Sequence, residues 1–177
     1  MKITDVATMY FEDPNRIVLE STLPDTITEW LSNQTPDTWH NVATTWNYDY
    51  GDEVLSWILQ QENCDKGTAA HVFEIVGTCE WLGDEALAKD ENNLCSIILK
   101  NWDRYNSGEF YNKNENREMY LDWVHKYVAK GMYADTPILD VAHYTGSRDA
   151  QSRFESEDGE IIVNYYHWMK ANNIEIS

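Results

Sequence analysis

The chain has 177 residues and a net charge of −18, with 31 acidic and 13 basic residues, eight glycines and four prolines. So few glycines and prolines beside 42% hydrophobic residues exclude a collagen-like or low-complexity chain and predict a folded globular protein. A surface this acidic repels nucleic acid and anionic membranes, and it attracts basic partners.

The first half of the chain has a helical spacing of apolar residues. This spacing predicts a first helix over residues 3–10, a second short helix over residues 14–19, and a third from Pro24. Thr35-Pro36, Asp52 and Asp65 are helix-start signals, so helices are expected to begin at each of them. The apolar faces of these helices should form one buried cluster that contains Trp39, Val42, Trp46, Leu55, Ile58, Ala70 and Phe73.

The second half is less regular. The apolar spacing in residues 78–90 indicates one turn of helix at 84–87, and a strong helix is expected after Asp90. A long helix is predicted near residues 120–128, a short helix or extended segment after Pro137, and a surface loop over 145–158. Residues 160–170 fit two structures, because the β-branched residues favour a strand and the apolar spacing favours a helix. We expect a helix there.

These elements predict an all-α fold with little or no sheet, in the form of a compact bundle or a short solenoid of antiparallel helical hairpins. A true repeat array is not supported, because the sequence has no clean period of 30–45 residues. We expect one acidic helical domain over residues 1–177, which could be divided into residues 1–77 and 78–177.

The stretch Trp39–Gly77 reads WHNVATTWNYDYGDEVLSWILQQENCDKGTAAHVFEIVG. Its W-H-x-V-A core, W-N-x-D-x-G turn, W-I-x-x-Q helix and C-D-x-G-T-A opening resemble a bacterial domain of unknown function, family 4274. Tyr48 stands where the family usually has Trp, and Glu62 stands where it has Pro. The resemblance implies a helical domain in a bacterial cytoplasm, and it implies no activity.

The cysteines and the chain start also favour the cytoplasm. Cys64, Cys79 and Cys95 form no C-x-x-C pair and are expected to be reduced. The first residues lack the apolar region of a signal peptide, and no apolar run approaches the roughly 20 residues of a membrane span.

No metal site, cofactor or catalytic residue is predicted. No histidine pair has a zinc-binding spacing, and the two N-x-D-x-G turns do not fit an EF-hand, because their glycines come one residue too early. Nucleophile and phosphate-loop motifs were not found. A neighbouring Asp65 and expected burial make Cys64 a structural residue rather than a reactive one.

A turn with aromatic and acidic residues is the strongest candidate for a binding site. Such a turn suits Lys or Arg of a partner, through ion pairs and cation–π contacts. Its residues are Tyr48, Asp49, Tyr50, Asp52 and Glu53, and a second patch contains Glu12 and Asp13.

Three function classes remain open. The first is a module that binds a basic protein, in its most concrete form an immunity protein that neutralises a bacterial toxin. The second is an enzyme with a dispersed site formed by Asp49, Asp65, His40 and His71. The third is a structural protein of the cytosol.

Overall fold

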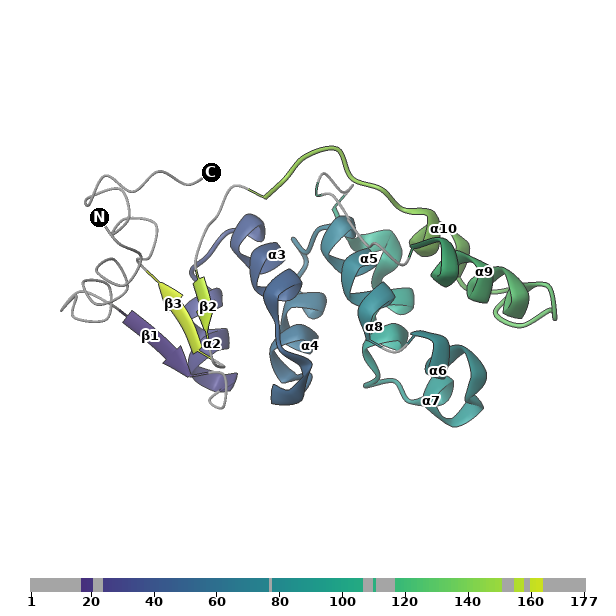
Figure 1. The fold of residues 1–177 in the computed structure, drawn as a ribbon, viewed down its shortest axis with the longest axis horizontal. Coiled ribbons are helices and arrows are strands. Elements are labelled where there is room, and N and C mark those ends of the chain that lie inside the picture. Colours follow the sequence, from purple (N-terminus) through teal and green to yellow (C-terminus); the bar gives the residue numbers. More distant parts are fainter. Residues whose placement is uncertain are drawn as a thin grey trace, which may run out of the picture.

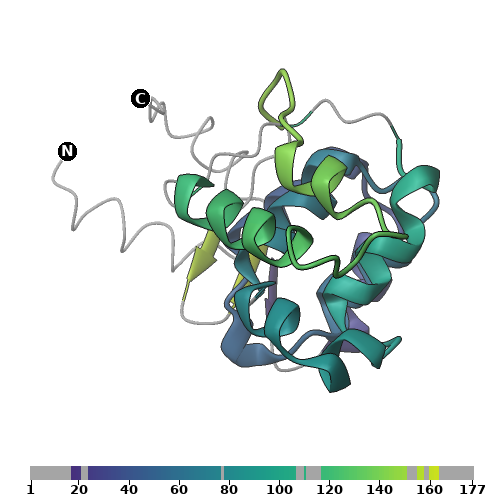
Figure 2. The same ribbon diagram turned by 90° about the vertical axis from the view of Figure 1, so that its right-hand side faces the viewer.

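The computed structural model describes residues 17–20, 24–76, 78–106, 110, 117–150, 155–157 and 160–163. Helices predominate in this part of the chain, and they stand in a row along the long axis of the molecule (Figure 1). They are α2 (Pro24–Leu31), α3 (Pro36–Thr45), α4 (Glu53–Gln60), α5 (Lys66–Ile75), α6 (Thr78–Gly83), α7 (Glu85–Lys89), α8 (Leu94–Asn101), α9 (Arg117–Val128) and α10 (Ile138–His143). Two 3-10 turns, η1 (Tyr48–Tyr50) and η2 (Trp102–Arg104), complete the set of described helical elements. The predicted all-α class is confirmed, and the end view shows a compact bundle (Figure 2).

Helix starts follow local capping chemistry at most positions. Pro36 begins α3, and the carboxylate of Asp65 accepts a hydrogen bond from the Gly67 amide at 2.7 Å at the start of α5. The carboxylate of Asp84 accepts from two amides of α7, and the Asn93 side chain accepts from the Cys95 amide of α8. The helix expected after Asp90 therefore starts four residues later, at Leu94, and residues 78–90 contain two short helices rather than one turn.

The prediction for Asp52 was wrong in one respect. Asp52 does precede α4, but its side chain makes no capping hydrogen bond and is exposed. The backbone of Asp52 is already in the right-handed helical region, whereas a capping side chain usually requires an extended residue. Its carboxylate therefore stays available on the surface.

Two helices expected near the ends of the chain are strands instead. β1 (Ile17–Glu20) and β3 (Glu160–Val163) pair in antiparallel register, with Ile17 opposite Val163 and Glu20 opposite Glu160. β2 (Glu155–Glu157) pairs with the other edge of β3, so the order is β1-β3-β2. Each short apolar run finds its hydrogen-bonding partner at the far end of the sequence, which a local helical spacing cannot indicate.

β2 also lies inside the segment that was predicted to be a surface loop, residues 145–158. Residues 144–150 leave α10 and run back along the row toward the sheet (Figure 1). The sheet lies next to α2 and so closes the α2 end of the row. The helix expected at 3–10 and the residues of the second patch, Glu12 and Asp13, lie outside the described residues.

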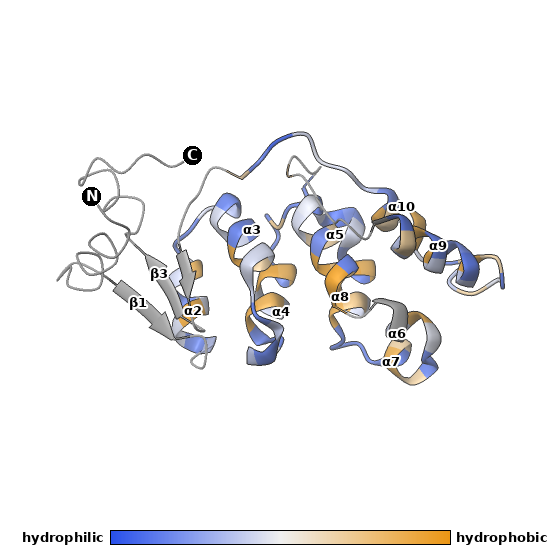
Figure 3. Cartoon of the chain, viewed as in Figure 1, coloured by the Kyte–Doolittle hydropathy of each residue, from blue (hydrophilic) through white to orange (hydrophobic). Residues whose placement is uncertain are grey.

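One hydrophobic core runs through the row. Apolar residues of α4, α8 and α10 face the neighbouring helices, and the outer surface is mostly hydrophilic (Figure 3). The predicted cluster is confirmed, because each of its seven members is buried in this core: Trp39, Val42, Trp46, Leu55, Ile58, Ala70 and Phe73. The apolar residues of α8 and η2 and the residue that follows η2 are also buried in it: Leu94, Ile97, Ile98, Trp102 and Tyr105.

Candidate functional site

The aromatic–acidic turn, defined here as Tyr48–Glu53, is held in place by its own backbone and by Trp46. The Trp46 indole donates to the Gly51 carbonyl at 2.9 Å, and the Asn47 side chain accepts from the Asp49 amide at 3.1 Å. Gly51 has a φ of +85°, a backbone conformation that residues other than glycine rarely adopt. The turn between α3 and α4 is therefore a fixed feature of the surface.

Within this turn the acids and the aromatics are placed differently. Asp49, Asp52 and Glu53 are exposed, whereas Tyr48 and Tyr50 are half-buried and pack against the core. The Tyr48 hydroxyl is buried, and burial followed by the charge of Asp52 raises the pKa of that phenol. Burial and then Glu53 raise the pKa of the Asp52 carboxyl. The three carboxylates of the turn therefore face solvent, while the two tyrosine rings of the same turn are partly covered by the core.

The charge around this turn extends over one half of the row. Residues 24–65, which form α2, α3, η1 and α4, contain eight acidic residues and no Lys or Arg. Residues 66–150 contain 14 acidic and nine basic residues, a net of −5. The exposed acids of the first group form no ion pair in the described part of the chain: Asp25, Glu29, Asp49, Asp52, Glu53 and Glu62. We call the surface that carries these six carboxylates the acidic half.

Partly exposed aromatic rings accompany these acids. Trp30 on α2 and Trp57 on α4 are half-buried against the core, as are the two tyrosines of the turn. The ring of Trp57 meets Trp39 edge-on, with 5.7 Å between the ring centroids. Half-buried aromatics surrounded by polar residues are typical of surfaces that contact other proteins.

A second cluster contains two of the four residues proposed for a dispersed enzyme site. His40 and His71 lie with their ring centroids 6.4 Å apart, and Nδ1 of His40 is 3.0 Å from the Thr68 hydroxyl. The Phe110 ring covers His40 at a centroid distance of 4.6 Å. Burial, and then His71, lowers the pKa of His40 to about 4, so this imidazole is neutral at pH 7.

The carboxylates around His40 are not the ones that were expected. Those that act on its pKa are Asp37 and Asp149, both of which raise it. Asp65 instead caps α5, and Asp49 is exposed in the aromatic–acidic turn. Asp37 accepts two hydrogen bonds from Arg148, at 2.8 and 3.3 Å, and this bidentate pair ties the returning segment 144–150 to α3.

Sequence reasoning missed Asp37, Phe110 and Arg148. The Arg148 guanidinium lies 4.5 Å from the centre of the Phe110 ring, and an isolated β-bridge joins the backbones of these two residues. These residues come from three distant parts of the chain, so no motif joins them. The sequence carries no local signal for them, because Arg148 is one of two arginines in residues 131–163.

The motif C-D-x-G-T-A is explained by packing in this region. Cys64 is buried, and burial raises the pKa of its thiol, so it is the structural residue that was predicted. A side chain at Gly67 would overlap the Phe110 carbonyl oxygen. Thr68 contacts His40, and Ala69 and Ala70 are buried in the core. The residues of this motif therefore serve the packing of α5 against the neighbouring parts of the chain.

Asp65 provides a direct test of the capping interpretation. Replacing it with Asn should change the free energy of unfolding little, because Asn caps a helix as well as Asp does. Replacing it with Ala should cost about 1 kcal/mol, because the Gly67 amide would lose its acceptor. Urea unfolding of both variants measures this. A large loss of stability in the Asn variant would show that the negative charge, rather than the cap, is required.

The fold and these contacts define an all-α bundle with an acidic half and a cluster of the buried His40 and the half-buried His71. Residues 34–104 match a family model described as a domain of unknown function (DUF4274). This match extends from the residue before Thr35 to the end of η2, so it is wider than the stretch that carried the resemblance. No curated protein and no solved structure matches the chain significantly. Among the described residues, no helix is long and apolar enough to cross a membrane.

Proposed function

We propose that this protein binds a basic protein partner through its acidic half. The observation that supports this proposal is the separation of charge along the row. Six exposed carboxylates lie on elements whose sequence contains no Lys or Arg, while basic residues are interspersed in the rest of the chain. Such a surface attracts a positively charged partner over several ångströms and speeds its association.

The half-buried aromatic residues supply the second requirement of a binding surface. Electrostatic attraction determines mostly how fast two proteins meet, and buried aromatic anchors determine mostly how long they stay together. Trp30, Tyr50 and Trp57 offer partly exposed rings close in sequence to the exposed acids. Because the core supports these rings, a partner would meet a surface that is already ordered.

The most specific form of the proposal is an immunity protein that neutralises a bacterial toxin. A toxin that acts on nucleic acid has a basic surface for phosphates, and an acidic domain can cover that surface. The same charge disfavours nucleic acid and anionic membranes as partners. We also propose a cytoplasmic location, which is supported by the buried Cys64 and Cys95, because neither forms a disulfide.

The enzyme alternative receives less support from the geometry. The buried, neutral His40 has the contacts of a structural histidine, and Asp37 is occupied by Arg148. Asp49 and Asp65 are not among the charged groups that act on the pKa of His40.

The proposal is tested with the partner obtained by pull-down from the source cell. Its association rate should fall steeply as salt rises, because screening weakens attraction between exposed charges. The double variant Asp49→Lys and Asp52→Lys should associate more slowly, by roughly tenfold at low salt, and keep the fold. Stopped-flow measurement of association and circular dichroism check both expectations.

A matched control separates local charge from net charge. The double variant Asp122→Lys and Asp135→Lys changes two exposed acids at the other end of the row by the same amount. It should associate faster than the variant of the acidic half. Tyr50→Ala should increase dissociation more than it slows association. An acidic partner, or binding that does not depend on ionic strength, would remove the electrostatic argument and the proposal with it.

A further inference from the structure

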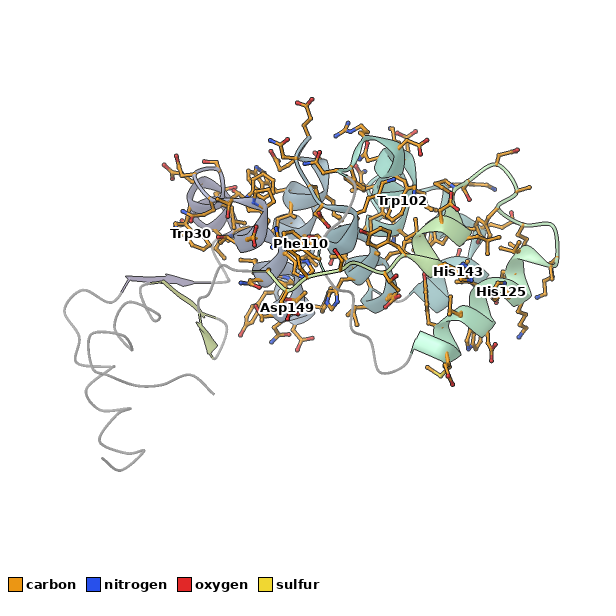
Figure 4. All side chains as sticks on the ribbon, turned by 90° about the horizontal axis from the view of Figure 1, so that it is seen from above. Trp30, Trp102, Phe110, His125, His143 and Asp149 are labelled. Carbon is orange, nitrogen blue, oxygen red and sulfur yellow. The ribbon has the colours of Figure 1, made fainter. Side chains whose placement is uncertain are left out.

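Two histidines from different helices lie together at the end of the row opposite the sheet. His125 belongs to the last turn of α9, and His143 is the last residue of α10. Their ring centroids are 5.1 Å apart, with an angle of 55° between the ring planes. Both side chains are exposed, and Figure 4 shows them at this end of the molecule. Because they lie on separate helices, no spacing motif in the sequence joins them.

The orientation of His143 is determined by a backbone contact. Its Nδ1 lies 2.8 Å from the Leu139 carbonyl oxygen. A carbonyl oxygen can only accept, so Nδ1 carries the hydrogen and donates it. In the neutral ring Nε2 then keeps its lone pair. Histidines that bind metal ions are usually oriented by such a hydrogen bond from the other ring nitrogen.

The separation of the two rings matches that of two imidazoles on one zinc ion. A zinc–nitrogen bond of about 2.0–2.1 Å places each ring centroid roughly 3.2 Å from the metal. At a tetrahedral angle of about 109°, the two centroids would then be about 5.2 Å apart. The observed separation of 5.1 Å between the ring centroids is close to this value.

We propose that His125 and His143 together bind Zn²⁺, with Nε2 of His143 as one ligand and a ring nitrogen of His125 as the other. No group of three His, Cys, Asp or Glu suited to a metal occurs in the part of the chain that the structure describes, so water completes the tetrahedron. Asp122 and Asp140 precede these histidines by one helical turn, and their charge favours a cation on this surface.

The consequence for the protein is a link between α9 and α10. A ligand that binds the folded chain and not the unfolded one stabilises the fold in proportion to the logarithm of its concentration. These two helices already pack against each other, and α10 also packs on α5. Zinc would therefore hold the end of the row together at the point where segment 144–150 leaves it.

The test uses the full chain after metal removal with EDTA. Equilibrium dialysis against ZnCl₂ should show zinc bound by the wild-type chain, and the melting temperature should rise with zinc. MgCl₂ should have no such effect, because Mg²⁺ prefers oxygen ligands. His125→Asn and His143→Asn should each weaken zinc affinity by about tenfold or more. His71→Asn, which changes a histidine on α5, should leave the zinc affinity unchanged.

Each variant is judged by the zinc-dependent change in its melting temperature, so a loss of stability from the substitution itself does not affect the comparison. The proposal is supported if His125→Asn and His143→Asn each lose one bound zinc ion and His71→Asn keeps it. A chain that binds no zinc, or zinc binding that survives both substitutions unchanged, overturns it.

Discussion

Trp46→Ala should lower the free energy of unfolding by about 3–5 kcal/mol. The side chain is 7% exposed in the core between α3 and α4, so its removal leaves a large cavity. The Gly51 carbonyl would also lose the hydrogen bond from the indole, and the aromatic–acidic turn would lose its support. Urea unfolding followed by circular dichroism measures the loss.

Two further variants show whether the cavity causes this effect. Trp46→Phe keeps most of the apolar volume and removes the indole donor, so it should be clearly more stable than the alanine variant. Thr44→Ala changes an exposed residue in the last turn of α3, two residues before Trp46, and should stay within about 0.5 kcal/mol of the wild type. A loss below about 1 kcal/mol for Trp46→Ala would contradict the burial of this ring.

Acid should destabilise the fold through His40. Burial, and then His71, lowers its pKa from 6.5 to about 4, so the folded chain keeps the neutral imidazole over this range. The unfolded chain takes up the proton near pH 6.5, and the folded chain does so only near pH 4. The unfolded state therefore binds more protons between these values, and stability falls as the pH falls from 6.5 to 4. The full loss is on the order of 3 kcal/mol, and about 2 kcal/mol of it should be reached at pH 5.

The contribution of His40 is isolated by comparison with His40→Gln. The free energy of unfolding is measured at pH 7 and pH 5 for both chains, and the variant should lose this part of the pH dependence. His71→Gln should retain most of it, because burial lowers the pKa of His40 more than His71 does. Equal pH dependence in the wild type and His40→Gln would show that other groups account for the acid sensitivity.

These tests concern a region in which stability and surface chemistry share the same residues. Trp46 supports the turn that presents Asp49 and Asp52, and His40 packs between Thr68 of α5 and the Phe110 ring. A variant of either buried residue would therefore be expected to disturb partner binding indirectly. The charge-reversal variants avoid this complication, because Asp49 and Asp52 are exposed.

Local chemistry was sufficient to predict most of the helices and their buried faces. The 3.6-residue period of large apolar residues placed Trp39, Val42 and Trp46 in the core, and Pro36 and Asp65 marked helix starts. A cap and an apolar stripe act within one or two helical turns, so the signal for them lies within a few neighbouring residues. The acidic character of residues 24–65 was also evident from the sequence, since charge depends on composition.

Only the tertiary structure decided the features that depend on residues far apart in the chain. Residues 17–20 and 160–163 are apolar runs that could form either a helix or a strand, and pairing with each other makes them strands. The Asp37–Arg148 pair and the His125–His143 pair likewise join elements whose distance in sequence says nothing of their distance in space. A contact of this kind depends on how whole helices pack, and packing is determined by the sum of many side chains rather than by the two residues that meet.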